Sequence, residues 1–448
     1  MELRVNAGAL SDSPASESGK DDRQGKEGRL LEEILQPENL NLAHKRVRAN
    51  GGSHGVDGMR TEELLPYLKQ HGESIRQSIL KGSYAPQPVR RVEIPKPDRG
   101  VRQLGIPTVL DRFIQQAIAQ VLNTIFDEGF SANSYGFRPG RNAHQAIQAA
   151  RKHIEEGYRW TIDLDLEKFF DRVNHDKLMS LVARKVKDKR VLKLIRKYLE
   201  SGIMTNGVKV KNEEGTPQGG PLSPLLANIM LDELDKELEK RGHRFCRYAD
   251  DCNIYVKSRK AGERVRMSVT RYIEEKLKLK VNRNKTAVDR PSRRKFLGFS
   301  FYTVKGRARN FIHSKCIWKF KEKVRAITSR SNGQSMERRI ERLNQLMTGW
   351  VHYFRLADMR RIANELDGWI RRRIRMCFWK QWKKIKARHD NLVRLGLGQL
   401  KAWEFAKSRK GCWSLSGSPV LTSTLTNGYI DKLGFMSLTK RLSMPYQF

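Results

Sequence analysis

The sequence predicts an α+β protein: a body in which strands and helices alternate, followed by a part that is almost wholly helical. Three observations lead to this prediction. Strand-like and helix-like runs alternate after a helix at about 111–126 and continue to about Tyr302. Beyond that point, apolar residues recur at helical spacing in two long stripes. The chain of 448 residues is too long for one ordinary core, so two or three packed regions are expected.

The N-terminal quarter contains a tail, helices and a hairpin. Residues 1–28 are rich in Ser, Gly, Asp and Glu and poor in large apolar side chains, which predicts a disordered tail. Residues 30–80 have apolar residues at helical spacing around a glycine-rich stretch at 50–58, which predicts helix, loop and helix. Prolines exclude helix from 85 to 109, where short strands around a Pro-Asp turn at 97–98 predict a basic hairpin.

The later elements are justified in the same way. A helix is expected over residues 111–126, before the alternating strands and helices. The first apolar stripe consists of Ile340, Leu343, Met347, Trp350, Val351 and Phe354. The second consists of Ile370, Ile374, Cys377, Phe378, Trp382 and Ile385. The last 45 or so residues show no clear periodicity, and the sequence supports no assignment for them.

The charge of the chain indicates a polyanionic partner. The formal net charge is +39 and the isoelectric point is near 10.2, far beyond what solubility requires. Nucleic acid is the first expectation, because each phosphate that a Lys or Arg neutralises adds to affinity. No apolar run approaches the roughly 18 residues of a spanning helix, so no membrane is expected.

The cysteines and the N-terminus indicate a compartment. There are five cysteines and no C-x-x-C pair, which favours neither a disulfide framework nor a zinc ribbon and predicts a reducing environment. The N-terminus has no apolar signal-peptide region, and its acidic residues are untypical of a transit peptide. A cytoplasmic location, bound to RNA or nucleoid DNA, is therefore expected.

Adjacent carboxylates lie between two strand-like runs. Residues 244–256 read as a hairpin with Asp250 and Asp251 at its tip. The alternative is a solvated turn, in which Asp is common. A second strand, residues 160–167, alternates so that Asp163, Asp165 and Glu167 share one face. Carboxylates converging from two strands of a basic chain favour Mg²⁺, and two such ions about 4 Å apart support phosphoryl transfer.

A Gly/Pro loop at residues 215–224 leads into an apolar helix between these two strands. Glycines permit close approach of the backbone to a ligand, and Gln218 inside this loop is suited to contact a nucleotide. The alternative is a plain loop and helix start.

These motifs together resemble the reverse transcriptases encoded by bacterial group II introns. The resemblance rests on the order and spacing of residues 165–171, 216–219 and 248–251, and it runs from about Leu30 to the C-terminus. It implies an RNA-directed DNA polymerase with a right-hand fold of fingers, palm and thumb. The implied regions are a tail at 1–28, an N-terminal extension at 29–82, fingers and palm at 83–305, a helical thumb or maturase domain at 306–395 and a DNA-binding region at 396–448.

The resemblance also implies roles for individual residues. Asp165, Asp250 and Asp251 match the ligands of two catalytic Mg²⁺ ions, whereas Asp163 falls outside the motif and is expected to be solvated or structural. Phe170 matches the aromatic residue that excludes ribonucleotides by its volume, although a core phenylalanine is an alternative. Four positions match contacts to the incoming deoxynucleoside triphosphate: Lys96, Arg102, Gln218 and Lys285. Three match the primer grip: Phe296, Leu297 and Gly298.

The helical part resembles the family's maturase domain at residues 349–354 and 369–384. Its apolar stripe is expected to pack, leaving arginines and lysines on another face for the backbone of structured RNA. No histidine follows His389 and the one late cysteine is Cys412, so the endonuclease domain of many relatives is expected to be absent. Such an intron would enter DNA that is already single-stranded or nicked.

The implied partners are group II intron RNA, a DNA target and primer, and deoxynucleoside triphosphates; protein partners remain unassigned. The protein would assist splicing and copy the intron RNA into DNA after insertion. Two alternatives stay open: an RNA splicing factor without polymerase activity, and a stand-alone reverse transcriptase used in defence or repair. The three intact aspartates speak against the first, and the second has the same catalytic residues.

Overall fold

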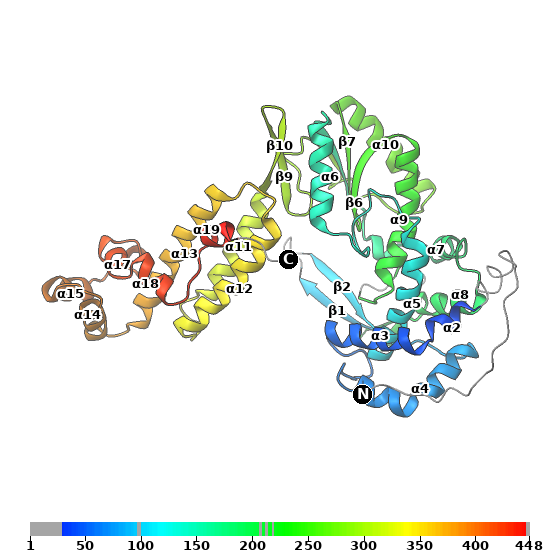
Figure 1. Ribbon diagram of the computed structural model, residues 1–448, viewed down its shortest axis with the longest axis horizontal. Coiled ribbons are helices and arrows are strands. Elements are labelled where there is room, and N and C mark those ends of the chain that lie inside the picture. The colour runs from blue at the N-terminus through cyan, green and yellow to red at the C-terminus, as the bar shows by residue number, and fades with distance from the viewer. Residues whose placement is uncertain (1–28, 96–99, 206–207, 211–213, 217–218, 445–448) are drawn as a thin grey trace, which may run out of the picture.

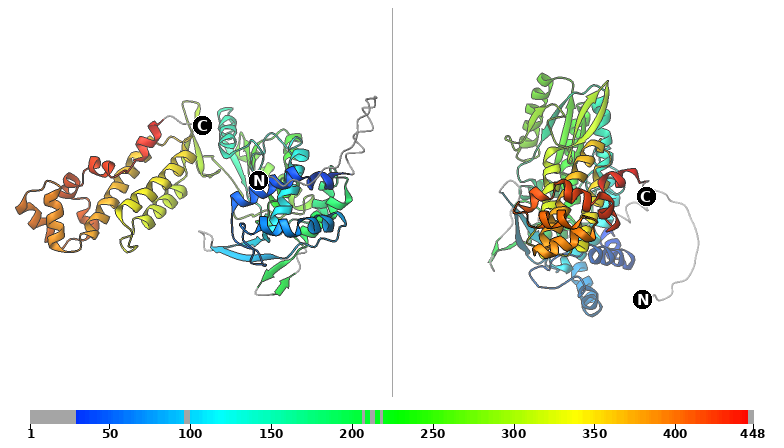
Figure 2. Two further views of the ribbon diagram at one scale, coloured as in Figure 1. Left: turned by 60° about the horizontal axis from the view of Figure 1, so that its bottom comes forward. Right: turned by 90° about the vertical axis from the view of Figure 1, so that its left-hand side faces the viewer.

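The computed structural model describes residues 29–95, 100–205, 208–210, 214–216 and 219–444. It has a mixed helix-and-sheet body and a helical part set off to one side of it (Figure 1), an arrangement that a second view repeats (Figure 2). The β9–β10 hairpin (Phe299–Val304 and Arg307–Ile312) lies between the two parts. Among the described residues, no helix is both long enough and apolar enough to cross a membrane.

The first half of the body is mostly helical around a four-stranded sheet. Its elements are α2 (Leu30–Ile34), α3 (Pro37–Asn50), α4 (Leu64–Leu80), β1 (Val89–Pro95), β2 (Val101–Ile106), α5 (Val109–Asp127) and α6 (Ala143–Glu155). The strands β1 and β2 form the expected antiparallel hairpin, and its turn at residues 96–99 lies outside the described residues. The hairpin is extended by β4 (Ile203–Thr205) and β5 (Val208–Val210), in the order β2-β1-β4-β5.

A second four-stranded sheet forms the centre of the body. Its strands are β3 (Trp160–Leu164), β6 (Arg244–Tyr248), β7 (Asp251–Val256) and β8 (Ala287–Asp289), in the order β6-β7-β3-β8. Successive side chains of a strand point to opposite faces. Accordingly Phe245 and Ile254 join one apolar core, while Cys246 and Tyr255 join another.

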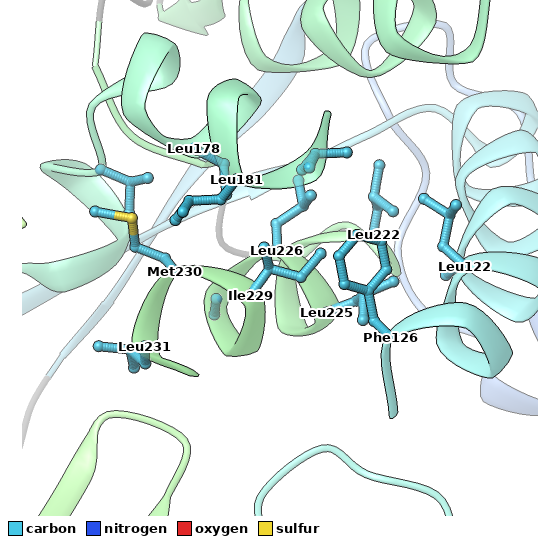
Figure 3. Close-up of a cluster of buried hydrophobic side chains, with 14 of the residues drawn as sticks. Leu122, Phe126, Leu178, Leu181, Leu222, Leu225, Leu226, Ile229, Met230 and Leu231 are labelled. Carbon is cyan, nitrogen blue, oxygen red and sulfur yellow. The ribbon is translucent and has the colours of Figure 1, made fainter. Parts of the chain in front are cut away.

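Helices cover both faces of this central sheet. The remaining elements of the body are the short 3-10 helix η1 (Phe169–Asp171), α7 (His175–Val182), α8 (Lys189–Leu199), α9 (Ser223–Lys240) and α10 (Arg259–Glu275). Helix α10 packs in the first core, and α6 packs in the second together with β9 and β10. Figure 3 shows the centre of the first core, where leucines of α9 meet side chains of α5 and α7.

The helical part contains the two expected stripes. Its elements are α11 (Ser314–Ile327), α12 (Met336–Phe354), α13 (Arg360–Gln381), α14 (Ile385–Arg394), α15 (Gln399–Ala406), α16 (Cys412–Leu415), α17 (Pro419–Thr424), α18 (Asn427–Lys432) and α19 (Leu438–Ser443). Every residue of the first stripe is buried. The prediction that the second stripe continues to Ile385 was wrong. Helix α13 ends at Gln381, and Ile385 begins another helix with its side chain exposed.

The C-terminal segment, which the sequence left unassigned, folds into short helices. Three of them begin at a hydroxyl residue whose side chain accepts a hydrogen bond from a backbone N–H of the first turn, namely Ser418, Thr426 and Ser437. Helices of four to eight residues are too short to show a 3.6-residue period, which explains why the sequence pattern did not reveal them.

Candidate active site

The adjacent aspartates lie at the tip of a two-stranded hairpin, as expected. Tyr248 on β6 pairs with Asp251 on β7, so Ala249 and Asp250 form a two-residue turn. Ala249 has φ +57°, a left-handed conformation that costs energy for a residue with a side chain. Contacts with the rest of the protein must therefore stabilise the turn, which carries the adjacent carboxylates of Asp250 and Asp251.

The register of β3 against β7 places the third aspartate opposite this turn. Leu164 pairs with Cys252, so the next opposed positions along the two strands are Asp165 and Asp251. Residues opposed in an antiparallel pair have Cβ atoms about 4.5–5.5 Å apart. The backbone of Asp165 is also fixed from the other side, because its N–H donates to the Thr286 hydroxyl at 3.1 Å.

The carboxylates repel one another electrostatically. Shielding from water raises the pKa of Asp251 to about 6, and the neighbouring charges of Asp250, Asp163 and Asp165 add to this shift. Asp251 is nonetheless exposed at the surface, so a ligand can reach it. A carboxylate that is shielded and surrounded by like charges gains most from a bound cation.

Asp163 forms an ion pair with Arg294. Arg294 donates to its carboxylate from Nη2 at 2.6 Å and from Nε at 3.0 Å. Burial raises the pKa of Asp163, and the guanidinium of Arg294 opposes this. Arg294 thus balances the charge of this carboxylate within the protein, as expected for an acid with a structural role.

The three aspartates do not form a closed ligand set. Within the described part of the chain, no three Asp, Glu, His or Cys side chains lie close enough together to hold a metal ion. The backbone nevertheless brings Asp165, Asp250 and Asp251 to one end of the sheet, and their oxygens are the donors that Mg²⁺ prefers. The donor chemistry fits Mg²⁺, and a closed site would require side-chain movement.

Phe170 is positioned by the Gly/Pro loop. The N–H of Thr216 donates to the Phe170 carbonyl at 2.6 Å, and a side chain at Gly215 would lie 2.6 Å from the same oxygen. Gly215 has φ +91°, so glycine is required there by both backbone conformation and space. His175 contacts the Gly215 carbonyl through Nε2 at 2.7 Å and holds the loop in turn.

A cavity of about 560 Å³ joins these elements. Phe170 and Asp250 both line it, together with Leu104 of β2 and Arg112 of α5. Gly219 closes it beside β2, where a side chain would lie 2.8 Å from the Gly105 carbonyl oxygen. The structure therefore brings the expected aromatic residue and one expected metal ligand to a single cavity.

The expected triphosphate contacts are placed only in part. Lys96 and Gln218 lie outside the described residues. The backbone of Arg102 pairs with Ile94 in the β1–β2 hairpin, but its side chain is not described. Lys285 is exposed in the turn before β8 and is not among the residues that line the cavity. Its backbone carbonyl accepts a hydrogen bond from Arg294 at 2.9 Å.

The expected primer grip forms a tight turn against α12. Leu297 and Gly298 both have positive φ, +50° and +86°. A side chain at Gly298 would lie 3.1 Å from the ring of Phe354, and the Tyr353 hydroxyl donates to the Leu297 carbonyl at 2.8 Å. No pattern in the sequence indicated that Tyr353, an ordinary member of a helical motif, holds this turn.

The arginines of α13 correct the expected basic face. Each of four contacts another segment: Arg371 pairs with Asp431, Arg372 donates to the Trp413 carbonyl, Arg373 to Thr328 and Arg375 to the Leu425 carbonyl. Arg371, Arg372 and Arg375 thus connect α13 to the C-terminal helices, and Arg373 connects it to the end of α11, because Arg offers several donors to oxygen acceptors. Between residues 369 and 386 the exposed cations are Lys380, Lys383, Lys384 and Lys386, and Arg360 and Arg361 are exposed at the start of α13.

Comparisons with known proteins agree with the motifs. Residues 94–301 match the model of the reverse transcriptase (RNA-dependent DNA polymerase) family, and residues 317–396 match the group II intron maturase-specific domain. Protein YkfC of Escherichia coli strain K12 is 36% identical over 300 residues, which cover 58% of this chain and 79% of YkfC.

Two further similarities cover a smaller share of the matched protein. Group II intron-encoded protein LtrA of Lactococcus lactis subsp. cremoris is 38% identical over 209 residues, 46% of this chain. The match spans 35% of LtrA, about a third of its length. A solved chain of a partial Cas6-RT-Cas1–Cas2 complex is 27% identical, with coverage of 55% of this chain and 42% of that chain and a TM-score of 0.36.

Proposed function

Because this chain belongs to the reverse transcriptase and maturase proteins of group II introns, we propose that it copies intron RNA into DNA and assists the splicing of that RNA. Its reverse transcriptase domain makes it an RNA-directed DNA polymerase by family. The observation that carries the proposal is the convergence of Asp165 with the Asp250–Asp251 turn at one end of the central sheet.

The two parts of the molecule suit a right-hand polymerase. In this proposal, residues 83–305 provide fingers and palm, with the central sheet in the palm and the β1–β2 hairpin in the fingers. Residues 29–82 form the N-terminal extension, 306–395 the thumb or maturase domain and 396–448 a DNA-binding region. The separation of body and helical part in Figure 1 supports this division.

The metal site would consist of Asp165, Asp250 and Asp251. Two Mg²⁺ ions bound there would activate the primer 3′ hydroxyl and stabilise the leaving phosphate oxygen. Burial, together with repulsion from Asp250 and the other nearby carboxylates, raises the pKa of Asp251, which supports this assignment because a divalent cation would stabilise the charged carboxylate. The backbone of both strands would hold the carboxylates in place, and the side chains would turn toward the ions.

The cavity beside the metal site would receive the incoming nucleotide. Phe170 lines it, and the Thr216 N–H of the Gly/Pro loop holds its backbone carbonyl, so its ring is well placed to exclude a 2′ hydroxyl. Contacts to the triphosphate are proposed for Lys96, Arg102, Gln218 and Lys285. Of these, Lys285 would need to move, since it does not line the cavity in the described structure.

Nucleic acid would extend from the palm along the helical part. The turn of Phe296, Leu297 and Gly298 would contact the primer strand, and exposed lysines around α13 and α14 would contact the phosphates of intron RNA or target DNA. The net charge of +39 supports such a partner. The protein would act in the cytoplasm as a complex with RNA.

Primer extension tests this function. Wild type, given Mg²⁺, deoxynucleotides and a DNA primer on an RNA template, is expected to synthesise DNA. The Asp250→Ala/Asp251→Ala variant should bind the same primer and template but extend it at least roughly 10³-fold more slowly. Tight RNA binding by wild type without any extension would instead favour a splicing factor that is not a polymerase.

A further inference from the structure

Arg247 is a completely buried cation directly before the catalytic turn. It lies on β6, one residue from Tyr248, and its exposed fraction is 0%. Its Nε donates to both carboxylate oxygens of Asp235 at 2.7 and 2.9 Å, and its Nη2 donates to Oδ2 at 2.5 Å. Asp235, on α9, is equally buried. A buried guanidinium with this bidentate geometry is fixed in orientation.

The other arm of Arg247 holds the turn itself. Its Nη1 donates to the carbonyl of Ala249 at 2.9 Å and to Oδ1 of Asn228 at 3.0 Å. Asn228 then donates from Nδ2 to the carbonyl of Gly136 at 2.9 Å. The peptide that links Ala249 to Asp250 is therefore tied through one guanidinium to α9 and to the segment before α6.

The segment around Gly136 supports the turn from its other side. The Tyr135 N–H donates to the Arg247 carbonyl and the Arg247 N–H donates to the Asn133 carbonyl, both at 2.9 Å. A side chain at Gly136 would lie only 2.2 Å from the Ala249 nitrogen, so this position admits glycine alone. The left-handed Ala249 is thus packed between the backbone around Gly136 and the side chain of Arg247.

The charge of Arg247 is balanced within the protein. Burial would lower its pKa, but the adjacent Asp235 carboxylate more than compensates, so the pKa is raised and the guanidinium stays charged. None of its described partners is a metal ligand. Its contacts lead to the Ala249 carbonyl and not to the carboxylates that would hold Mg²⁺.

We propose that Arg247 is a positioning residue for the metal site: with Asp235 and Asn228 it fixes the Ala249 peptide and thereby sets where Asp250 and Asp251 present their carboxylates. This inference rests on the proposed function, because it takes these aspartates to bind the catalytic ions. Lysine cannot replace Arg247, since an ammonium lacks the planar set of donors that spans Asp235, Asn228 and Ala249 at once.

The test compares Arg247→Lys with a matched control, Arg339→Lys. Arg339 is also buried and also donates to carbonyls, those of Gln334, Ile327 and Ser329, but it lies in the helical part. Binding of Mn²⁺ to the full chain is measured by the electron paramagnetic resonance signal of the free ion, with Asp250→Asn as the reference for loss of the site. Rates of single-nucleotide addition are measured alongside.

We expect Arg247→Lys to weaken Mn²⁺ binding roughly 10- to 100-fold and to slow nucleotide addition by a similar factor, with unchanged affinity for primer and template. Arg339→Lys should match wild type in both measurements. Asn228→Ala, which leaves the ion pair intact, should shift both in the same direction by less, and it decides the matter if Arg247→Lys does not fold.

Folded Arg247→Lys and Asn228→Ala proteins with wild-type Mn²⁺ affinity would overturn the inference, as would an equal loss in Arg339→Lys. The proposed function fails separately. A wild type that never extends a primer would sink it, yet the Mn²⁺ titrations would still decide whether Arg247 shapes the site.

Discussion

Asp163 and Asp165 lie two positions apart in the chain, and the structure gives them different surroundings. The alternation of the sequence predicted a shared strand face, but β3 ends at Leu164, so the strand pairing includes Asp163 and stops just before Asp165. What the sequence could not reveal is that Arg294, 131 residues away along the chain, neutralises Asp163. The sequence also did not reveal the buried Arg247–Asp235 ion pair, because a charged residue in a strand ordinarily predicts a position that faces solvent.

The first prediction at this scale concerns the pH dependence of Asp251. Its pKa in the metal-free fold, about 6, exceeds the ordinary value of 3.8. The contribution of this group to stability is therefore fully present below about pH 4 and is lost as pH rises through about 6. Asp251→Asn should consequently be more stable than wild type at pH 7 without metal, and equally stable near pH 4.

Thermal unfolding of both proteins in the presence of a chelator, from pH 4 to pH 7.5, measures this difference. Added Mg²⁺ should stabilise wild type at pH 7 and leave Asp251→Asn nearly unchanged. A stability difference that stays constant across this pH range would show that Asp251 is not shielded and repelled as described.

The second prediction at this scale concerns sugar selection. Phe170→Ala should raise the efficiency of ribonucleotide incorporation relative to deoxynucleotide incorporation by roughly 10- to 200-fold, the usual effect of added space in an apolar pocket. Single-nucleotide extension with each triphosphate gives the ratio. Phe170→Tyr, which keeps the volume, serves as control. An unchanged ratio in Phe170→Ala would mean that the ring is a core side chain.

At the scale of elements, long helices and strands with a clear apolar periodicity could be predicted from the sequence, and short ones could not. The β6–β7 hairpin, α5 and the stripe of α12 were expected from the sequence and are confirmed. Helices α15–α19 were not, because their short spans depend on caps and on contacts with α13. The contacts of Arg371, Arg372 and Arg375 were not predicted for the same reason: their partners belong to the C-terminal segment, which shows no periodic pattern.

The link between α12 and the expected primer grip leads to a prediction about Tyr353. Burial raises its pKa to about 12, so the hydroxyl stays protonated and donates to Leu297 at working pH. Tyr353→Phe keeps the ring and removes this bond, which should cost about 0.5–1.5 kcal/mol of stability. It should also raise the KM for primer and template while the KM for nucleotide stays unchanged.

Steady-state extension with varied primer–template and varied nucleotide separates these two effects. Arg309→Lys, on the neighbouring β9–β10 hairpin and exposed, provides a control for general loosening of this junction. Equal changes in both KM values, or none in either, would argue against a role for this turn in primer contact.

At the scale of the whole molecule, the sequence predicted the division into a mixed body and a helical part, and the structure confirms it. It could not predict that α6, which comes early in the chain, packs in the same core as β9, β10 and α12. The central sheet is thereby shared between both cores, and its end that carries Asp250 and Asp251 lies close to the junction of the two parts.

The lysines between residues 380 and 384 are exposed, whereas Arg372 contacts another segment, and this difference predicts how RNA binding depends on salt. Replacing Lys380, Lys383 and Lys384 by alanine should leave stability unchanged and reduce the slope of log affinity against log salt by about 0.7–0.9 for each lost phosphate contact. Arg372→Ala should instead destabilise the fold, because it removes contacts to Trp413. Filter binding from 50 to 300 mM salt gives the slope, and a flat response in wild type would contradict the basic surface.

The central claim is that Asp165, Asp250 and Asp251 surround the same divalent ions, and iron-directed cleavage tests it most directly. Fe²⁺ bound in place of Mg²⁺ reduces added hydrogen peroxide to hydroxide and a hydroxyl radical, added ascorbate returns Fe³⁺ to Fe²⁺, and the radicals cut the nearby backbone. The account predicts cuts near residues 164–167 and 249–252, suppressed by excess Mg²⁺ and lost in Asp250→Asn/Asp251→Asn. Cuts at one segment alone, or cuts that persist in the variant, would contradict it.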